Sequence, residues 1–254
     1  ILFDLDQAIV QRAKTTISKN LQSLTDKKKI SQEQKADAES RIIFTSDIND
    51  CKADLIIEAI IEKLEAKVSL FNQLAKLNAP GTILATNTSS LSVTEIAAKI
   101  PEPERMVGLH FFNPAPLMKL VEIVNTPYTS SQTTNSALSF ARKLGKTPVL
   151  CKDAPGFIVN HVARPYYLEA LRLVEEGYAD FETIDQLLES AGFKMGPFKL
   201  MDLIGNDINY AVSCSVYEAM DRPLRLMPST IQQEKVKNAE LGRKTGKGYY
   251  DYEV

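Results

Sequence analysis

Hydrophobic positions in the first 151 residues form short apolar runs that alternate with segments of helical periodicity. The apolar runs predict strands at residues 1–3, 42–44, 54–59, 82–86, 106–112, 120–124 and 147–151. Apolar side chains spaced three or four positions apart predict helices at residues 8–29, 63–77, 93–99 and 133–144. The segment between the first helix and Ile42 is expected to be a loop. Strands that alternate with helices indicate an α/β fold of the doubly wound type, with a mainly parallel sheet covered on both faces. The continuous apolar core of residues 54–59 predicts that this strand is buried on both faces.

The character of the chain changes after residue 151. Four segments with helical periodicity follow, with no convincing strand between them, at residues 157–176, 181–191, 200–220 and 229–241. We therefore predict a dinucleotide-binding, Rossmann-type sheet domain at residues 1–151 and an all-α domain at residues 152–254. The segment 166–173 places apolar side chains on two faces of its helix, and the second face needs a partner to bury it. This favours a homodimer formed through the C-terminal helices.

Composition and charge narrow the classes of function. Of the 254 residues 44% are hydrophobic and 24% are charged, and the net charge is -2. Such a balance is ordinary for a globular protein and gives no general attraction to nucleic acid or to an anionic membrane. No apolar run is long enough to span a bilayer. Cys51, Cys151 and Cys214 match neither a metal-ligand spacing nor a disulfide framework. We therefore predict no metal site and expect a reducing, cytoplasmic location.

One part of a dinucleotide-binding fold is not found in the sequence. Such folds join the first strand to the first helix by a G-x-G-x-x-G turn, whose backbone N–H groups bind the pyrophosphate. The closely spaced glycines of residues 242–248 lie at the opposite end of the chain and have a different spacing. Residues 1–4 resemble instead the second strand of that fold. That strand ends in an acid that binds a ribose hydroxyl, for which Asp4 and Asp6 are the candidates.

We therefore expect a strand, a glycine-rich turn and a helix, roughly 25–30 residues in all, to precede Ile1. Without that strand, the second and fourth strands of the fold would face each other across a gap and leave backbone groups unpaired. The alternative is that a different fold starts at Ile1.

Several motifs, in order and from end to end of the chain, are similar to those of the 3-hydroxyacyl-CoA dehydrogenase family. They are Asn-Thr-Ser-Ser-Leu at 87–91, Leu-His-Phe-Phe-Asn-Pro at 109–114, Met-Lys-Leu-Val-Glu at 118–122, Lys-Asp-Ala-Pro-Gly-Phe-Ile-Val-Asn at 152–160, Met-Gly-Pro-Phe at 195–198 and Gly-Arg-Lys-Thr-Gly-Lys-Gly-Tyr-Tyr at 242–250. The resemblance implies a reversible, NAD-dependent oxidation of (3S)-3-hydroxyacyl-CoA to 3-ketoacyl-CoA. Two alternatives stay open. One is a gulonate or other hydroxy-acid dehydrogenase of the same superfamily, which the second and third motifs argue against. The other is an inactive dimerising module, which the missing glycine turn supports.

The resemblance implies that His110 and Glu122 form the catalytic pair. The chain has only two histidines, His110 and His161, and an imidazole suits the removal of a hydroxyl proton near neutral pH. A carboxylate on the other ring nitrogen would orient the imidazole and stabilise its charged form. The alternatives are a satisfied core histidine and a solvated or salt-bridged carboxylate. His161 stands where the family commonly has an arginine.

The resemblance further implies that Ser89 and Asn160 donate hydrogen bonds to the substrate oxygen and the histidine. Alternatively, Ser89 caps the helix that follows it and Asn160 is a surface amide. The residues implied to bind NAD are Asp4, Ala59, Glu62, Lys67, Ser89, Asn113 and Lys244. The residues implied to bind the acyl-CoA substrate are Asn20, Lys27, Ser89 and Asn160. The charged members other than Asp4 are alternatively exposed helix ends or solvated loop charges. An acid at the end of the second strand would favour NAD over NADP, because it repels a 2′-phosphate.

Overall fold

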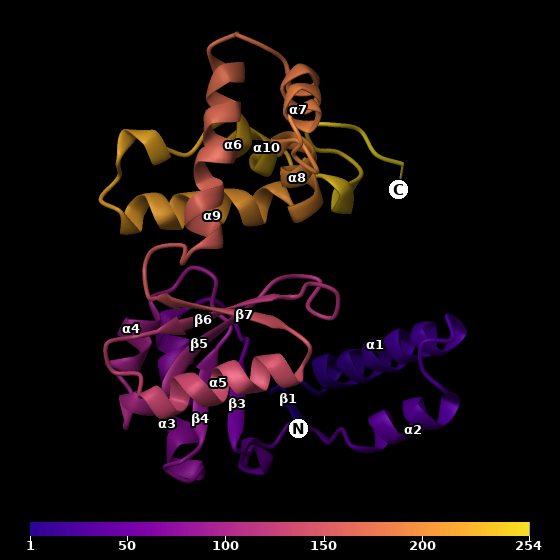
Figure 1. Cartoon of the computed structure of the whole chain (residues 1–254), viewed down its shortest axis with the longest axis vertical. Helices are drawn as coiled ribbons and strands as arrows, with labels where there is room; N and C mark the ends of the chain where they lie inside the picture. The colour runs from indigo at the N-terminus through magenta and orange to yellow at the C-terminus, as the bar shows by residue number, and fades with distance from the viewer. Residues whose placement is uncertain (254) are drawn as a thin grey trace.

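The computed structural model describes residues 1–253 and shows a sheet domain joined to a helical domain (Figure 1). The strands are β1 (Leu2–Phe3), β2 (Phe44–Thr45), β3 (Leu55–Glu58), β4 (Ile83–Thr86), β5 (Met106–Phe111), β6 (Leu120–Asn125) and β7 (Thr147–Lys152). The helices of the sheet domain are α1 (Gln7–Asp26), α2 (Gln32–Ser40), α3 (Leu64–Leu77), α4 (Val93–Ala97) and α5 (Ser131–Lys143). The helices of the helical domain are α6 (Val159–Glu175), α7 (Phe181–Ser190), α8 (Pro197–Ile204), α9 (Asn206–Ala219) and α10 (Thr230–Lys237). None of the described helices is both long and apolar enough to cross a membrane.

A five-stranded sheet forms the centre of the first domain, with the strand order β3-β4-β5-β6-β7. Neighbouring strands are parallel except for β5 and β6, which pair antiparallel. Alternate side chains of a strand point to opposite faces of a sheet. Leu84 and Met106 accordingly pack against α3 and α4, whereas Ala85 and Val107 pack against α5. The prediction of a doubly wound, mainly parallel sheet with helices on both faces is confirmed.

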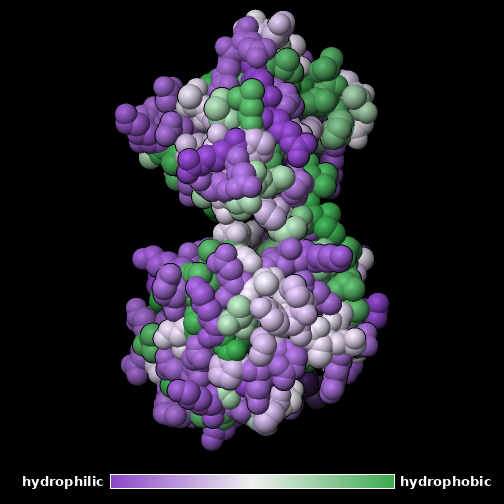
Figure 2. All heavy atoms as spheres, turned by 90° about the vertical axis from the view of Figure 1, so that its left-hand side faces the viewer, coloured by the Kyte–Doolittle hydropathy of each residue, from purple (hydrophilic) through white to green (hydrophobic). Residues whose placement is uncertain are grey.

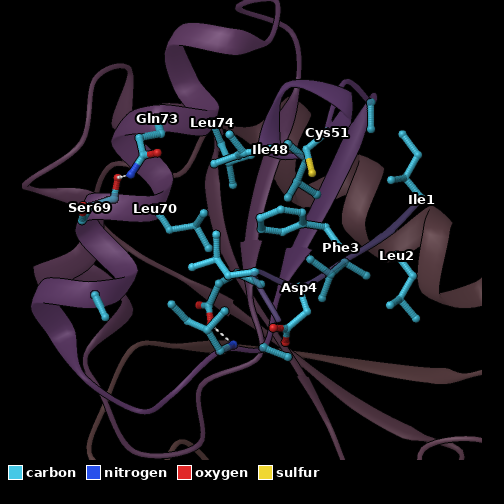
Figure 3. Close-up of a pocket in the computed structure, with 18 of the residues that line it drawn as sticks. Ile1, Leu2, Phe3, Asp4, Ile48, Cys51, Ser69, Leu70, Gln73 and Leu74 are labelled. Atoms are coloured by element: carbon cyan, nitrogen blue, oxygen red, sulfur yellow. Dashed lines mark hydrogen bonds between the residues drawn. The ribbon is translucent and has the colours of Figure 1, made fainter. Parts of the chain in front are cut away.

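The first two strands lie outside this sheet. β1 pairs only with β2, and β3 is an outer strand of the main sheet. A cavity of about 810 Å³ lies between β1 and β3 and is lined by these two strands and by α3. Phe3, Asp4 and Leu70 are among its residues (Figure 3). The predicted gap between the second and fourth strands of the fold is thus confirmed within the described residues. The prediction that residues 54–59 are buried on both faces is wrong. Ile57 is 39% exposed, because β3 is an outer strand beside the cavity.

Three local predictions differ from the structure. The segment expected to be a loop contains α2, which begins with a capping box formed by the side chains and backbone N–H groups of Ser31 and Gln34. The short strand expected at residues 42–44 is β2, one to two residues further along. The single helix predicted at residues 200–220 is two helices, α8 and α9, which meet at Gly205. The φ of +103° at Gly205 is unfavourable for residues with a side chain and ends the first of them.

A buried carboxylate holds the C-terminal segment of the helical domain in place. Asp202 on α8 is 1% exposed and accepts hydrogen bonds from the backbone N–H groups of Tyr249 and Tyr250 at 3.0 and 3.1 Å. The Tyr252 hydroxyl donates a further one at 3.0 Å. Gly248 packs directly on this carboxylate, since a Cβ at Gly248 would lie 2.0 Å from Asp202 Oδ1. The close approach explains why a glycine stands at this position.

Gly248→Ala is expected to lower the free energy of unfolding by roughly 1–3 kcal/mol, because the added methyl group must push Asp202 out of its hydrogen bonds. Urea denaturation followed by circular dichroism measures the change. Gly81→Ala is the matched control, because a Cβ at Gly81 meets no atom within 4 Å. Equal stability of the two variants would contradict the packing argument.

Candidate active site

Two buried polar side chains face each other in the main sheet. In the antiparallel pair of β5 and β6, His110 lies directly opposite Glu122, so both side chains point to the same face. His110 Nδ1 is 2.7 Å from Glu122 Oε2, and the two residues are 5% and 1% exposed. The alternative of a solvated Glu122 is therefore wrong. The spacing of twelve residues does not reveal this contact, which depends on the register of the hairpin.

The other oxygen of the Glu122 carboxylate faces the helical domain. Glu122 Oε1 accepts hydrogen bonds from the backbone N–H groups of Ile158 and Val159 at the start of α6, each at 2.9 Å. Burial by itself raises the pKa of Glu122. The hydrogen bonds from His110 and from the two α6 amides outweigh burial and hold this pKa below its usual value. The carboxylate is therefore ionised near neutral pH.

The imidazole of His110 is placed to exchange a proton. Because Nδ1 faces the carboxylate, the neutral ring carries its proton there and keeps a lone pair on Nε2. In the described part of the chain, Nε2 has no hydrogen-bond partner. The rings of Phe112 and Phe157 pack on the imidazole with centroid distances of 4.6 and 5.5 Å and shield it from water. Such an arrangement can serve as a general base and, once protonated, as a general acid.

The turn after β4 lies beside this pair. Asn87 Oδ1 accepts a hydrogen bond from the backbone N–H of Phe111 at 2.8 Å, which ties the turn to β5 next to the histidine. Ser89 follows in the same turn, and among the described residues its hydroxyl has no hydrogen bond. The alternative that Ser89 caps α4 is wrong, because the Ser92 side chain is the cap. The Ser89 hydroxyl is thus available to a ligand.

Asn160 belongs to the helical domain. It lies in the first turn of α6, directly after the two amides that bind Glu122, and is half-buried. The two domains also meet at the Ser89 turn, where the Ser215 hydroxyl donates to the Ser90 carbonyl at 3.5 Å. The second histidine, His161, is bonded elsewhere, since its Nδ1 donates to the Pro155 carbonyl at 3.1 Å. Of the four predicted catalytic residues, His110 and Glu122 are in contact. Ser89 and Asn160 lie in the two segments that bond to the Phe111 N–H and to Glu122, and among the described residues no hydrogen bond joins their side chains to the pair.

A buried cluster of charges supports the Ser89 turn. Lys67 Nζ lies 2.6 Å from Glu58 Oε1 and 3.2 Å from Glu62 Oε2, and the Lys67 side chain is 1% exposed. Glu62 Oε1 accepts hydrogen bonds from the backbone N–H groups of Ser89 and Ser90 at 3.1 and 3.2 Å. The alternative that Lys67 is an exposed helix end is wrong. The sequence prediction missed Glu58, although a lone acid that ends an apolar run was a usable signal.

Asp4 lies where a ribose-binding acid is expected. It directly follows β1 and lines the cavity, as Ala59 does after β3 (Figure 3). The Asp6 N–H donates to Asp4 Oδ1 at 2.9 Å, whereas the Asp6 carboxylate caps α1 by accepting from the Ala8 N–H at 2.7 Å. Of the two candidates, Asp4 therefore faces the cavity and Asp6 is used by the helix. A carboxylate in this position fits the ribose of a dinucleotide.

The remaining predicted binding residues are not bonded to the catalytic pair. Asn20, in the second half of α1, and Lys27, directly after that helix, are exposed. Helix α1 extends away from the main sheet together with α2 (Figure 1). Lys244 belongs to the helical domain, where its Nζ is 2.5 Å from Asp207 Oδ1. Asn113 lies in the loop between β5 and β6. Within the described residues, no hydrogen bond or ion pair joins these four side chains to His110 or Glu122.

Comparison with known proteins gives two family matches that together span the chain. Residues 1–154 match the model described as "3-hydroxyacyl-CoA dehydrogenase, NAD binding domain". Residues 156–252 match the model described as "3-hydroxyacyl-CoA dehydrogenase, C-terminal domain". The sequence is 48% identical over 254 residues to 3-hydroxyadipyl-CoA dehydrogenase of Escherichia coli, covering 99% of this chain and 54% of the relative. It is 41% identical over 261 residues to the mitochondrial hydroxyacyl-coenzyme A dehydrogenase of Sus scrofa, covering 99% and 83%.

Solved structures give the same result. A 3-hydroxybutyryl-CoA dehydrogenase from Escherichia coli K12 superposes with a TM-score of 0.96 at 47% identity, covering 100% of this chain and 54% of that one. A (S)-3-hydroxybutyryl-CoA dehydrogenase from Ralstonia eutropha superposes with a TM-score of 0.94 at 35% identity, covering 99% and 89%. The chain thus spans about half the length of these Escherichia coli relatives and most of the length of the other two.

Proposed function

The chain belongs to the 3-hydroxyacyl-CoA dehydrogenase family, and we propose that it catalyses the reversible, NAD-dependent oxidation of a (3S)-3-hydroxyacyl-CoA to the 3-ketoacyl-CoA. The observation that supports this most is the buried pair of His110 and Glu122, which is bonded to the first turn of α6, the turn that carries Asn160, and lies beside the turn that carries Ser89. A gulonate-type dehydrogenase and an inactive dimerising module are not favoured by the family matches. The chain spans about half the length of the Escherichia coli relatives. Its catalytic activity is therefore proposed from its own site and is not taken over from them.

In the proposed reaction, His110 Nε2 accepts the proton of the substrate hydroxyl. Glu122 keeps Nδ1 protonated and stabilises the imidazolium that forms. The Ser89 hydroxyl and the Asn160 amide donate hydrogen bonds to the oxygen as its negative charge develops. NAD, when bound, accepts the hydride from the carbon that bears this oxygen. In the reverse direction, the imidazolium returns its proton to the 3-keto oxygen.

The binding roles are proposed from the family resemblance and, for Asp4 and Ala59, also from their position. Asp4 and Ala59 line the cavity at the ends of β1 and β3, where the ribose would lie. The Lys67 ammonium is bound by two carboxylates. Its proposed effect on NAD binding is therefore indirect, through Glu62 and the Ser89 turn. The other residues proposed to contact NAD are Ser89, Asn113 and Lys244. Those proposed to contact coenzyme A are Asn20 and Lys27, with Ser89 and Asn160 at the acyl end.

A homodimer through the helical domain stays a prediction. Exposed apolar side chains on this domain support it, since Val162, Tyr178, Leu187 and Leu224 are 68 to 76% exposed. Figure 2 shows hydrophobic residues at the surface of the helical domain, in green. A second copy would bury such side chains. The division of the chain after residue 151 and a cytoplasmic location are likewise predictions.

The oxidation of NADH by acetoacetyl-CoA tests the proposed function. The assay compares this chain with a version preceded by a strand, a glycine-rich turn and a helix. We expect the longer version to be active, because backbone N–H groups of such a turn bind the pyrophosphate. Loss of this activity on His110→Gln would tie it to the proposed site. If neither version oxidises NADH with acetoacetyl-CoA, the assignment of an acyl-CoA substrate is wrong.

A further inference from the structure

One carboxylate connects the two domains. Glu122 uses Oε2 to bind His110 at 2.7 Å within the sheet domain. It uses Oε1 to accept hydrogen bonds at 2.9 Å from the backbone N–H groups of Ile158 and Val159, which are 36 and 37 residues away in the sequence. These two amides begin α6, the first helix of the helical domain. The carboxylate that orients the proposed base is therefore held by both domains, one oxygen each.

A tight linker makes this contact possible. It leaves the sheet domain at Asp153, whose carboxylate accepts two hydrogen bonds of 2.7 Å from the start of α4. Three residues later, Gly156 has a φ of +72°, and a Cβ there would lie 2.9 Å from the backbone N of His161. It would also lie 2.9 Å from Cγ2 of Val216 on α9. A residue without a side chain is needed for α6 to begin directly on Glu122.

The surroundings of Glu122 contain few other charges. The titratable groups that face it are His110 from β5 and the Cys151 thiol from β7. Burial, followed by the charges of Glu122 and Asp153, raises the pKa of Cys151 to about 12, so the thiol stays neutral. The N-terminal end of α6 adds the positive end of a helix dipole. The negative charge is therefore balanced by His110 on one side and by α6 on the other.

We propose that the first turn of α6 is a positioning element of the active site, which holds Glu122 ionised and oriented toward His110 only while the helical domain is docked on the sheet. The same turn carries Asn160, so docking would complete the acid–base pair and deliver a substrate donor together. The mechanistic part of this inference rests on the proposed function, because it takes the pair to be catalytic. The structural part concerns only the contact between Glu122 and α6.

Amide NMR shifts test the contact without any activity measurement. In the ¹H–¹⁵N spectrum of the ¹⁵N-labelled chain, the Ile158 and Val159 resonances should shift together as Glu122 is protonated on acidification. In Glu122→Gln, this common inflection should disappear. Resonances that keep the inflection in Glu122→Gln, or that show none in the unaltered protein, would overturn the proposal even if the enzyme is active. An inactive enzyme that shows the inflection would instead refute the proposed function alone.

Gly156→Ala tests the effect on catalysis. A Cβ at Gly156 pushes the start of α6 away, and the loss of amide donors should raise the lowered pKa of Glu122. Reduction of acetoacetyl-CoA needs an ionised Glu122, so the acid limb of its pH–rate profile should move to higher pH by about one unit. The inflection of the amide resonances should move with it. Gly145→Ala is the matched control, because Gly145 has a similar φ of +70° and a Cβ there meets nothing within 4 Å.

The outcomes separate positioning from a purely structural role. A shifted acid limb in Gly156→Ala, with an unshifted limb in Gly145→Ala, supports the proposal. A uniform loss of rate at every pH, with unmoved amide inflections, would mean that Gly156 matters only for folding and would overturn it. If Gly156→Ala does not fold, the spectra of the unaltered protein and of Glu122→Gln decide the question.

Discussion

Replacement of His110 by glutamine is expected to lower the kcat for acetoacetyl-CoA reduction by roughly 10²–10⁴, the usual contribution of a positioned general acid or base. Glutamine can still donate a hydrogen bond to Glu122, so the sheet should keep its register. It cannot exchange a proton near neutral pH, so the 3-keto oxygen would have to take its proton from water. The effect should appear in kcat, because the protonated imidazole acts on the transition state rather than on substrate binding.

His161→Gln is the matched control for this variant. It makes the same chemical change at the second histidine, whose Nδ1 bonds to the Pro155 carbonyl instead of a carboxylate. A glutamine amide can donate to that carbonyl, and most of the activity should remain. Fluorescence titration with NADH should give similar dissociation constants for both variants and the unaltered protein. Near-normal turnover of His110→Gln would remove His110 from the role of acid and base.

From the sequence, the contact between His110 and Glu122 could be assigned only through the family resemblance. The strands at 106–112 and 120–124 are visible as apolar runs, and His110 and Glu122 stand out as polar residues within them. Their contact depends on β5 and β6 running antiparallel in one register, which neither run encodes by itself. In a parallel arrangement the two side chains would lie at different heights along the sheet.

Other parts of the site leave weaker traces in the sequence. The Ile158 and Val159 groups that bind Glu122 are backbone amides, which every residue except proline has. Only the adjacent Gly156 reveals that the chain turns tightly there. The fold was more predictable, because burial of both sheet faces imposes the alternation of apolar runs and helices. The break between α8 and α9 at Gly205 was not predictable from the pattern, because apolar residues on both sides of it continue the helical periodicity.

The charge cluster around Lys67 is the second place where a large effect is expected. Its ammonium is buried between Glu58, whose side chain is 0% exposed, and Glu62, whose side chain is 36% exposed. Glu58 also accepts hydrogen bonds from the Ile60 N–H at 2.6 Å and from the Thr86 hydroxyl at 2.7 Å. The cluster thus connects the ends of β3 and β4 with the start of α3.

Lys67→Met is expected to lower the free energy of unfolding by roughly 3–5 kcal/mol, because it leaves the Glu58 carboxylate buried without a cation. Urea denaturation measures the loss, and an unchanged m-value would show that the denatured state is the same. Lys76→Met on the exposed side of α3 is the matched control and should change stability by no more than about 0.5 kcal/mol.

The double variant Glu58→Gln/Lys67→Met separates charge from packing. An amide at position 58 removes the uncompensated charge, keeps an oxygen for the Ile60 N–H and can donate from its NH2 group to the Thr86 hydroxyl, so part of the stability lost in Lys67→Met should return. No recovery would mean that the loss comes from the packing of the lysine stem. Equal stability of Lys67→Met and Lys76→Met would show that the ion pair adds nothing to the fold. Glu62 would then bind the Ser89 and Ser90 amides without help from the Lys67 charge.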